Sequence, residues 1–139
     1  MFDAQIIHSM VVHFPIALIA TGFAFDIVSH FYRSDDFVKV GFWNLFAGML
    51  SIVATIITGL LADSLVGHME NPLPIFSTHG SLQFVASFLL LGILIFRLIG
   101  GGKLPVSLMK RNLLLAAHAL GIGLLYYGAH LGAKLANRI

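Results

Sequence analysis

Seven histidines are the residues of this sequence whose type and placement could support chemistry. His8 and His13 open the first long apolar stretch, His79 opens the third, His130 closes the fourth, and His68 lies in the link before the third. A neutral imidazole is the most common metal ligand in proteins. Two imidazoles from different helices of a bundle can also hold a haem iron. These five histidines are therefore the candidates for a cofactor or metal site.

The absence of cysteine narrows the kind of site. Thiolate-bound zinc, cysteine-held iron–sulfur clusters and covalently attached c-type haem all need cysteine. A haem would therefore be haem b, held without a covalent bond, and a metal bound by histidine would be zinc, copper or non-haem iron. Asp63 or Glu70, in the same second loop as His68, could add an oxygen ligand to such a metal.

Four apolar stretches must position these side chains. Hydrophobic residues make up 58% of the 139 residues and charged residues only 10%, against about 25% charged residues in globular domains. A spanning helix needs about 20 mostly apolar residues, and four stretches qualify, at about 11–31, 40–62, 82–99 and 113–132. The links are short, so consecutive helices must run antiparallel. The sequence predicts one all-α integral membrane domain, a four-helix bundle of up-down-up-down topology.

This topology places five of the seven histidines on one side of the membrane. His13, His79 and His130 lie within a few residues of the hydrocarbon boundary on three different helices, so we expect their rings to meet. His8 lies about a turn and a half further out, and His68 lies in the loop. The first and third helices are diagonal in a simple bundle, which makes His13 with His79 the preferred haem pair.

Asp26 is the one carboxylate well inside a predicted span. It lies at a depth close to that of His118 on the fourth helix, and His30 follows it by four residues. The simplest interpretation is a buried Asp–His hydrogen bond that ties the first helix to the fourth. The alternative is a proton-relay pair or part of a second cofactor site. Pro15, two residues after His13, predicts a kink that aims this histidine.

Small residues lie along several helix faces. Ala17, Ala20 and Ala24 follow His13, and Gly123 lies in line with His130, where small side chains could leave room for a flat macrocycle. The pair Gly128 and Gly132 is typical of close helix packing in lipid. Packing alone is the preferred interpretation of these stripes.

Charge predicts the orientation. The side with the first and third links carries six cations: Arg33, Lys39, Arg97, Lys103, Lys110 and Arg111. The side with both termini carries two, Lys134 and Arg138. The positive-inside rule then puts the first and third loops in the cytoplasm. In a bacterial inner membrane both termini and most histidines would be periplasmic. The N-terminus has no basic region, so we read the first stretch as a retained helix. The cations form no patch that would indicate nucleic-acid binding.

The stretch from His8 to Leu18, HSMVVHFPIAL, resembles the opening of a bacterial membrane protein family known as domain of unknown function 2231. The family's usual opening reads His-Pro, a short gap, then Val-His-Phe-Pro-Ile-Ala, and Ser9 stands where the family commonly has proline. The resemblance continues through residues 59–63, His79 and residues 118–130, and covers most of the chain.

The resemblance implies a four-helix membrane domain with histidines near one face. Similar domains are fused to Rieske-type iron–sulfur domains, which suggests electron transfer, but the family has no assigned activity to carry over. The positions that match its histidines are His8, His13, His79 and His130, with His68 and His30 matching less closely.

Three functions remain open from the sequence. The first is a b-type cytochrome that carries electrons between quinone and a periplasmic redox partner, either alone or as a subunit of an oxidoreductase. The second is a histidine-bound zinc, copper or non-haem iron site. The third is a non-catalytic membrane subunit that anchors a larger complex or a homo-oligomer, with the histidines at its interfaces.

Overall fold

The computed structural model describes residues 4–32, 34–63, 74–75 and 78–135, with only the backbone of Asp63. Its regular structure is helical throughout this part of the chain. The helices are α1 (Ala4–Val11), α2 (His13–Tyr32), α3 (Asp35–Asp63), α4 (His79–Ile99) and α5 (Leu108–Leu135).

Four segments are long and apolar enough to cross a membrane: Ala4–Tyr32, Asp35–Ala62, His79–Ile99 and Leu108–Leu135. Each contains one predicted span, so the all-α, four-span fold is confirmed. The helices run beyond the predicted ends, most clearly at the N-terminus. There α1 adds about two turns before residue 11, and His8 becomes part of a helix instead of a preceding loop.

The first segment is interrupted where the sequence predicts a kink. Helix α1 ends at Val11, Val12 is a turn residue, and α2 begins at His13. Pro15 has no N–H to donate to the carbonyl of Val11 four residues earlier, which breaks the ladder at this point. The bond from Val12 N to His8 O, 3.0 Å, is still made. The break separates the short helix that carries His8 from the longer one that carries Asp26.

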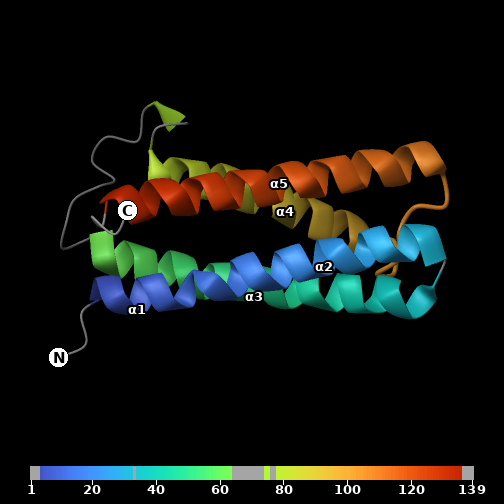
Figure 1. Cartoon of the computed structure of the whole chain (residues 1–139), viewed down its shortest axis with the longest axis horizontal. Coiled ribbons are helices and arrows are strands. Elements are labelled where there is room, and N and C mark those ends of the chain that lie inside the picture. The colour runs from blue at the N-terminus through green and yellow to red at the C-terminus, as the bar shows by residue number, and fades with distance from the viewer. Residues whose placement is uncertain (1–3, 33, 64–73, 76–77, 136–139) are drawn as a thin grey trace.

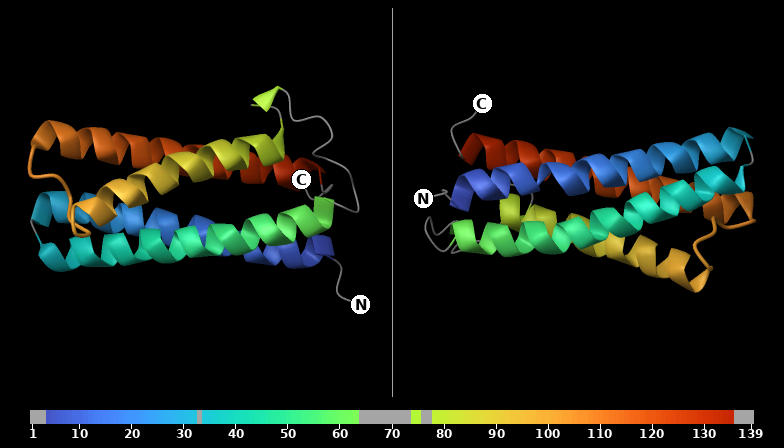
Figure 2. Two further views of the ribbon diagram at one scale, coloured as in Figure 1. Left: turned by 180° about the vertical axis from the view of Figure 1, so that it is seen from behind. Right: turned by 90° about the horizontal axis from the view of Figure 1, so that it is seen from below.

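The helices form two antiparallel hairpins that stack as two layers. Helices α1 and α2 pair with α3, and α4 pairs with α5 (Figures 1 and 2). Both ends of the described chain lie at one end of the bundle, and the turns from α2 to α3 and from α4 to α5 lie at the other (Figure 1). The core between the layers includes Ile19, Leu45, Leu90 and Leu125. Many other large apolar side chains, such as Phe88, point outward, as suits contact with lipid tails.

Glycines bring the helices of each hairpin close together. A Cβ at Gly22 of α2 would lie 2.9 Å from the carbonyl oxygen of Gly41 of α3, and one at Gly121 of α5 would lie 2.8 Å from Leu90 of α4. Gly128 and Gly132 likewise face side chains of α4. These contacts agree with the packing interpretation of the small-residue stripes, including the Gly128–Gly132 pair.

The small residues near His13 and His130 that could leave room for a macrocycle point outward. A Cβ at Gly123 would meet nothing within 4 Å. Ala17 and Ala24 are exposed, and Ala20 is only half-buried. These residues therefore line no space inside the bundle, and their role beside a macrocycle stays a prediction.

Candidate functional site

At the end of the bundle where the termini lie, two histidines from different hairpins face each other. His8 comes from α1 and His79 from the first turn of α4. Their ring centres are 6.3 Å apart and their planes lie at 73°. Both side chains are half-buried. This is the closest approach between imidazoles in the described part of the chain, and it joins the two layers of the fold.

Hydrogen bonds hold both rings through Nδ1. His79 Nδ1 lies 2.5 Å from the carbonyl oxygen of Gly128, which can only accept, so this nitrogen carries the hydrogen and the lone pair of His79 is on Nε2. His8 Nδ1 lies 3.2 Å from the hydroxyl oxygen of Thr58, which can donate or accept.

Two glycines make room for these rings. A Cβ at Gly132 of α5 would lie 2.8 Å from Cε1 and 2.9 Å from Nδ1 of His79. A Cβ at Gly59 of α3 would lie 3.1 Å from Cε1 of His8. Each imidazole is thus packed against backbone from a neighbouring helix, so the pair is held by all of the spanning segments.

The spacing of the rings is within the range for two imidazoles that bind one metal ion. Two imidazoles that each bind an ion at about 2 Å have ring centres no more than about 6 Å apart. A ligating histidine usually donates its other ring nitrogen to a carbonyl or another acceptor, which fixes the ring's orientation. The bond from His79 Nδ1 to the carbonyl of Gly128 is of this kind.

The other predicted ligands lie elsewhere. His13 is exposed on α2, where its Nδ1 donates to the carbonyl of Ser9 at 2.7 Å, and His130 is exposed on α5. The expected meeting of His13, His79 and His130 at one depth does not occur, because α1 continues outward as a helix and brings His8 to the level of His79. In the structure, the histidine ring beside His79 is that of His8 and not that of His13.

No three His, Asp or Glu side chains group into a metal site among residues 4–32, 34–63, 74–75 and 78–135. His68 and Glu70 lie outside the described residues, as does the side chain of Asp63. Their predicted contributions stay predictions.

At the opposite end of the bundle, Asp26 forms a buried ion pair. Its Oδ2 lies 2.7 Å from an Nη of Arg97 on α4, and both side chains are at most 1% exposed. His118 Nδ1 is 3.8 Å from the same oxygen, too far for a hydrogen bond. The expected Asp26–His118 hydrogen bond is therefore wrong, since Arg97 occupies that oxygen and ties the first span to the third.

His118 and His30 each pack against an aromatic ring at this end. His118 is buried with its ring edge against Phe23, at 5.2 Å between ring centres, and His30 packs against Phe31. His118 Nε2, His30 Nδ1 and Asp26 Oδ1 have no hydrogen-bond partner within the part of the chain that the structure describes. The proton-relay and second-cofactor interpretations of Asp26, His30 and His118 stay predictions.

Sequence reasoning missed Arg97 because it counted this residue among the loop cations. Arg97 lies inside the third predicted span, between Ile95–Phe96 and Leu98–Ile99, at 0% exposure. A buried carboxylate in a membrane needs a cation or comparable partner. Asp26 was thus the signal that could have identified Arg97. Gln83, whose amide donates to the carbonyl of Leu125 at 3.1 Å, was also missed.

Comparison with protein families decides the relationship suggested by the HSMVVHFPIAL stretch. The family described as "Predicted membrane protein (DUF2231)" matches residues 4–139. The chain belongs to this family. The match covers all five helices, so DUF2231 membership and multi-pass membrane location apply to the whole described bundle. Comparisons with curated proteins and with solved structures found no match.

Proposed function

We propose that this DUF2231 protein is a membrane b-type cytochrome, in which His8 and His79 hold a non-covalent haem near one face of the membrane. The observation that supports this most is the spacing of the two rings, 6.3 Å between centres, with the Nδ1 of each ring bonded to a neighbouring helix. The sequence favoured His13 as the partner of His79, and the proposed ligand His8 lies about one and a half helical turns before it.

The number of ligands favours haem over a bare metal ion. Zinc sites use three or four protein ligands, and the described residues bring two imidazoles together. Most of the ligands of a haem iron come from the porphyrin, so two histidines from the chain would be enough to hold it. Zinc, copper and non-haem iron remain the alternatives that the test below separates.

The chain's own residues would hold and orient the ligands. The carbonyl of Gly128 and the hydroxyl of Thr58 hold the two rings through their Nδ1 atoms. Gly59 and Gly132 allow the backbones of α3 and α5 to lie against the imidazoles. A bound haem would supply one-electron redox chemistry. Its partners would be quinone within the bilayer and a periplasmic redox protein.

The visible absorption spectrum tests this proposal. The protein, produced with ample haem and purified in mild detergent, is measured as oxidised and then after reduction with dithionite. Haem b with two imidazole ligands gives sharp reduced α and β bands and a shifted Soret band. A featureless spectrum would overturn the proposal. Elemental analysis for zinc, copper and iron would then test the metal alternative, and an empty result there would leave the anchoring role.

A further inference from the structure

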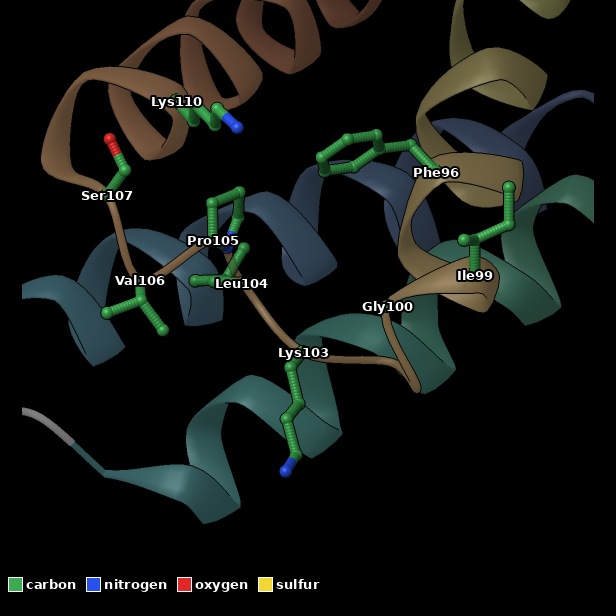
Figure 3. A pocket seen from close by; sticks show the side chains of 9 residues that line it. All are labelled: Phe96, Ile99, Gly100, Lys103, Leu104, Pro105, Val106, Ser107 and Lys110. Atoms are coloured by element: carbon green, nitrogen blue, oxygen red, sulfur yellow. The ribbon is translucent and has the colours of Figure 1, made fainter.

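A recess lies at the end of the bundle opposite the histidine pair, between the end of α4 and the start of α5 (Figure 3). Its volume is about 400 Å³. Helix α4 ends at Ile99 and α5 begins at Leu108, so the recess lies where two membrane spans reach the boundary between lipid and water.

The lining of the recess is amphipathic. Lys103 and Lys110 are its two basic residues, and no carboxylate lines it. The side chain of Lys110 points across the recess, whereas that of Lys103 points away from it (Figure 3). Phe96, Ile99 and Val106 contribute apolar surface, and Ile99 and Val106 are 84% and 94% exposed. In Figure 3, Lys110 of α5 and Phe96 of α4 lie on facing sides of the recess. A ligand that fills it would combine negative charge with apolar surface.

Both lysines are available for such a ligand. Neither ammonium group forms an ion pair or a hydrogen bond with a residue in the described ranges. Lys39 at the same end differs, because its Nζ lies 3.1 Å from Oδ1 of Asp36. Two cations beside an apolar wall leave a local positive charge for which the described residues provide no counter-ion.

The connecting loop that forms the recess is held in place at several points. Arg97 donates to the carbonyl of Gly102 at 3.0 Å, and Arg111 donates to the carbonyl of Pro105 at 3.0 Å. Leu104, between these two anchors, is buried at 9% exposure. The recess is therefore preformed, and a ligand would not have to order the loop on binding.

We propose that this recess binds an anionic phospholipid. Its phosphate headgroup would be bound by Lys110, Lys103 would add positive charge at the rim, and its acyl chain would lie along Phe96 and Ile99. Basic pockets between spanning helices on the cytoplasmic side are suited to anionic headgroups. A free phosphate ion would use the lysines but not the apolar wall, so the occupant to which the structure points is the lipid.

Native mass spectrometry of the full chain tests the proposal. The protein in mild detergent is mixed with equal amounts of phosphatidylglycerol and phosphatidylcholine. We expect preferential retention of phosphatidylglycerol, with about fivefold weaker binding for Lys103→Gln and again for Lys110→Gln, from the usual contribution of one lysine near an anionic lipid. Lys39→Gln, which removes a cation outside the recess, should keep the preference. Lys103→Arg should keep it too, because the charge remains.

Three results would overturn the proposal. These are equal retention of the two lipids by the unmodified protein, an equal loss in Lys39→Gln, and displacement of phosphatidylglycerol by an equal concentration of glycerol 1-phosphate. The last would show a site for small anions instead of lipid. Thermal unfolding in phosphatidylcholine alone, where the lysine variants should match the unmodified protein, separates lost binding from lost folding.

Discussion

At the residue scale, the imidazole of His79 has little freedom to move. Its Nδ1 is bonded to the carbonyl of Gly128, and Gly132 lies against the same ring. A shift of this ring would break the bond and change the distance to His8. The glycine beside it should therefore matter for cofactor binding as well as for helix packing.

Gly132→Ala tests this constraint. The new Cβ would lie 2.8 Å from Cε1 of His79, so the ring or α5 must move. We expect the haem-to-protein ratio, measured as the pyridine haemochrome, to fall severalfold. Gly123→Ala on the same helix is the matched control, since its Cβ would meet nothing within 4 Å. Equal haem content in both variants would contradict the packing argument.

Because Asp26 and Arg97 form a buried pair, we expect the effects of replacing them on the free energy of unfolding to be strongly coupled. Removal of one partner leaves the other charge buried without compensation, which costs about 3–5 kcal/mol. We expect Asp26→Asn and Arg97→Gln each to lower the free energy of unfolding by about this amount, and the double variant to lose less than the sum.

Titration of the folded protein from mild detergent into dodecyl sulfate measures this coupling. Asp36→Asn is the control, because its pair with Lys39 is exposed and such pairs contribute less than about 1 kcal/mol. Additive losses in the double variant would show that Asp26 and Arg97 do not stabilise each other.

The sequence predicted histidines at the candidate site but not which two of them lie side by side. His79 and its histidine partner follow from matched depths on alternating helices, but the choice between His8 and His13 depends on where the first helix begins. That start was placed near residue 11, and the structure continues the helix to Ala4. Rotation of α2, which turns His13 outward, is set by tertiary packing and is not encoded in hydropathy.

At the element scale, the loop between α4 and α5 depends on glycine. Gly101 and Gly102 have φ values of 66° and 77°, in the left-handed region that disfavours other residues. Gly102 N donates to the carbonyl of Arg97 at 2.7 Å and helps end α4. The sequence predicted a turn at these glycines, and the structure agrees.

Gly101→Ala isolates the conformational effect. A Cβ there meets nothing within 4 Å, so the expected loss of about 1–2 kcal/mol in unfolding free energy comes from the left-handed backbone alone. Gly100→Ala is the control, since its φ is −81° and its Cβ would make only ordinary contacts from 3.5 Å. The same detergent titration compares them, and equal stability of the two variants would refute the backbone explanation.

The four spans could be predicted because about 20 apolar residues between polar links leave few alternatives. The break at Val12 followed from Pro15. The pairing of α2 with α3 and of α4 with α5 followed from short links. What hydropathy could not provide is which apolar positions face lipid, since Phe88 and Leu90 are equally apolar but only Leu90 is buried.

At the scale of the whole molecule, the two ends of the bundle differ chemically. One end holds His8 and His79, and the other holds the Asp26–Arg97 pair and the lysine recess. The proposed orientation puts the histidine end in the periplasm and the recess in the cytoplasm, by the positive-inside rule. Arg97 no longer counts toward that rule as a loop charge, but Lys39, Lys103, Lys110 and Arg111 still lie at the same end.

Single-cysteine labelling tests this orientation, because the natural chain has no cysteine. Lys134→Cys lies near the end of α5 on the histidine side, and Lys103→Cys lies in the α4–α5 loop. In spheroplasts, a maleimide that cannot cross the membrane should label Lys134→Cys at once and Lys103→Cys only after permeabilisation. The reverse pattern would place the histidine pair on the cytoplasmic side.

The central claim is that His8 and His79 hold a haem, and the haem content of four variants tests it most directly. His8→Ala, His79→Ala, His13→Ala and His130→Ala are purified in parallel from cells supplied with haem, and the reduced spectrum and the haem-to-protein ratio are recorded for each. The structure predicts that the first two lose the reduced α and β bands while the exposed His13 and His130 variants keep them. Retention of the haem by His8→Ala together with its loss in His13→Ala or His130→Ala would contradict the assignment.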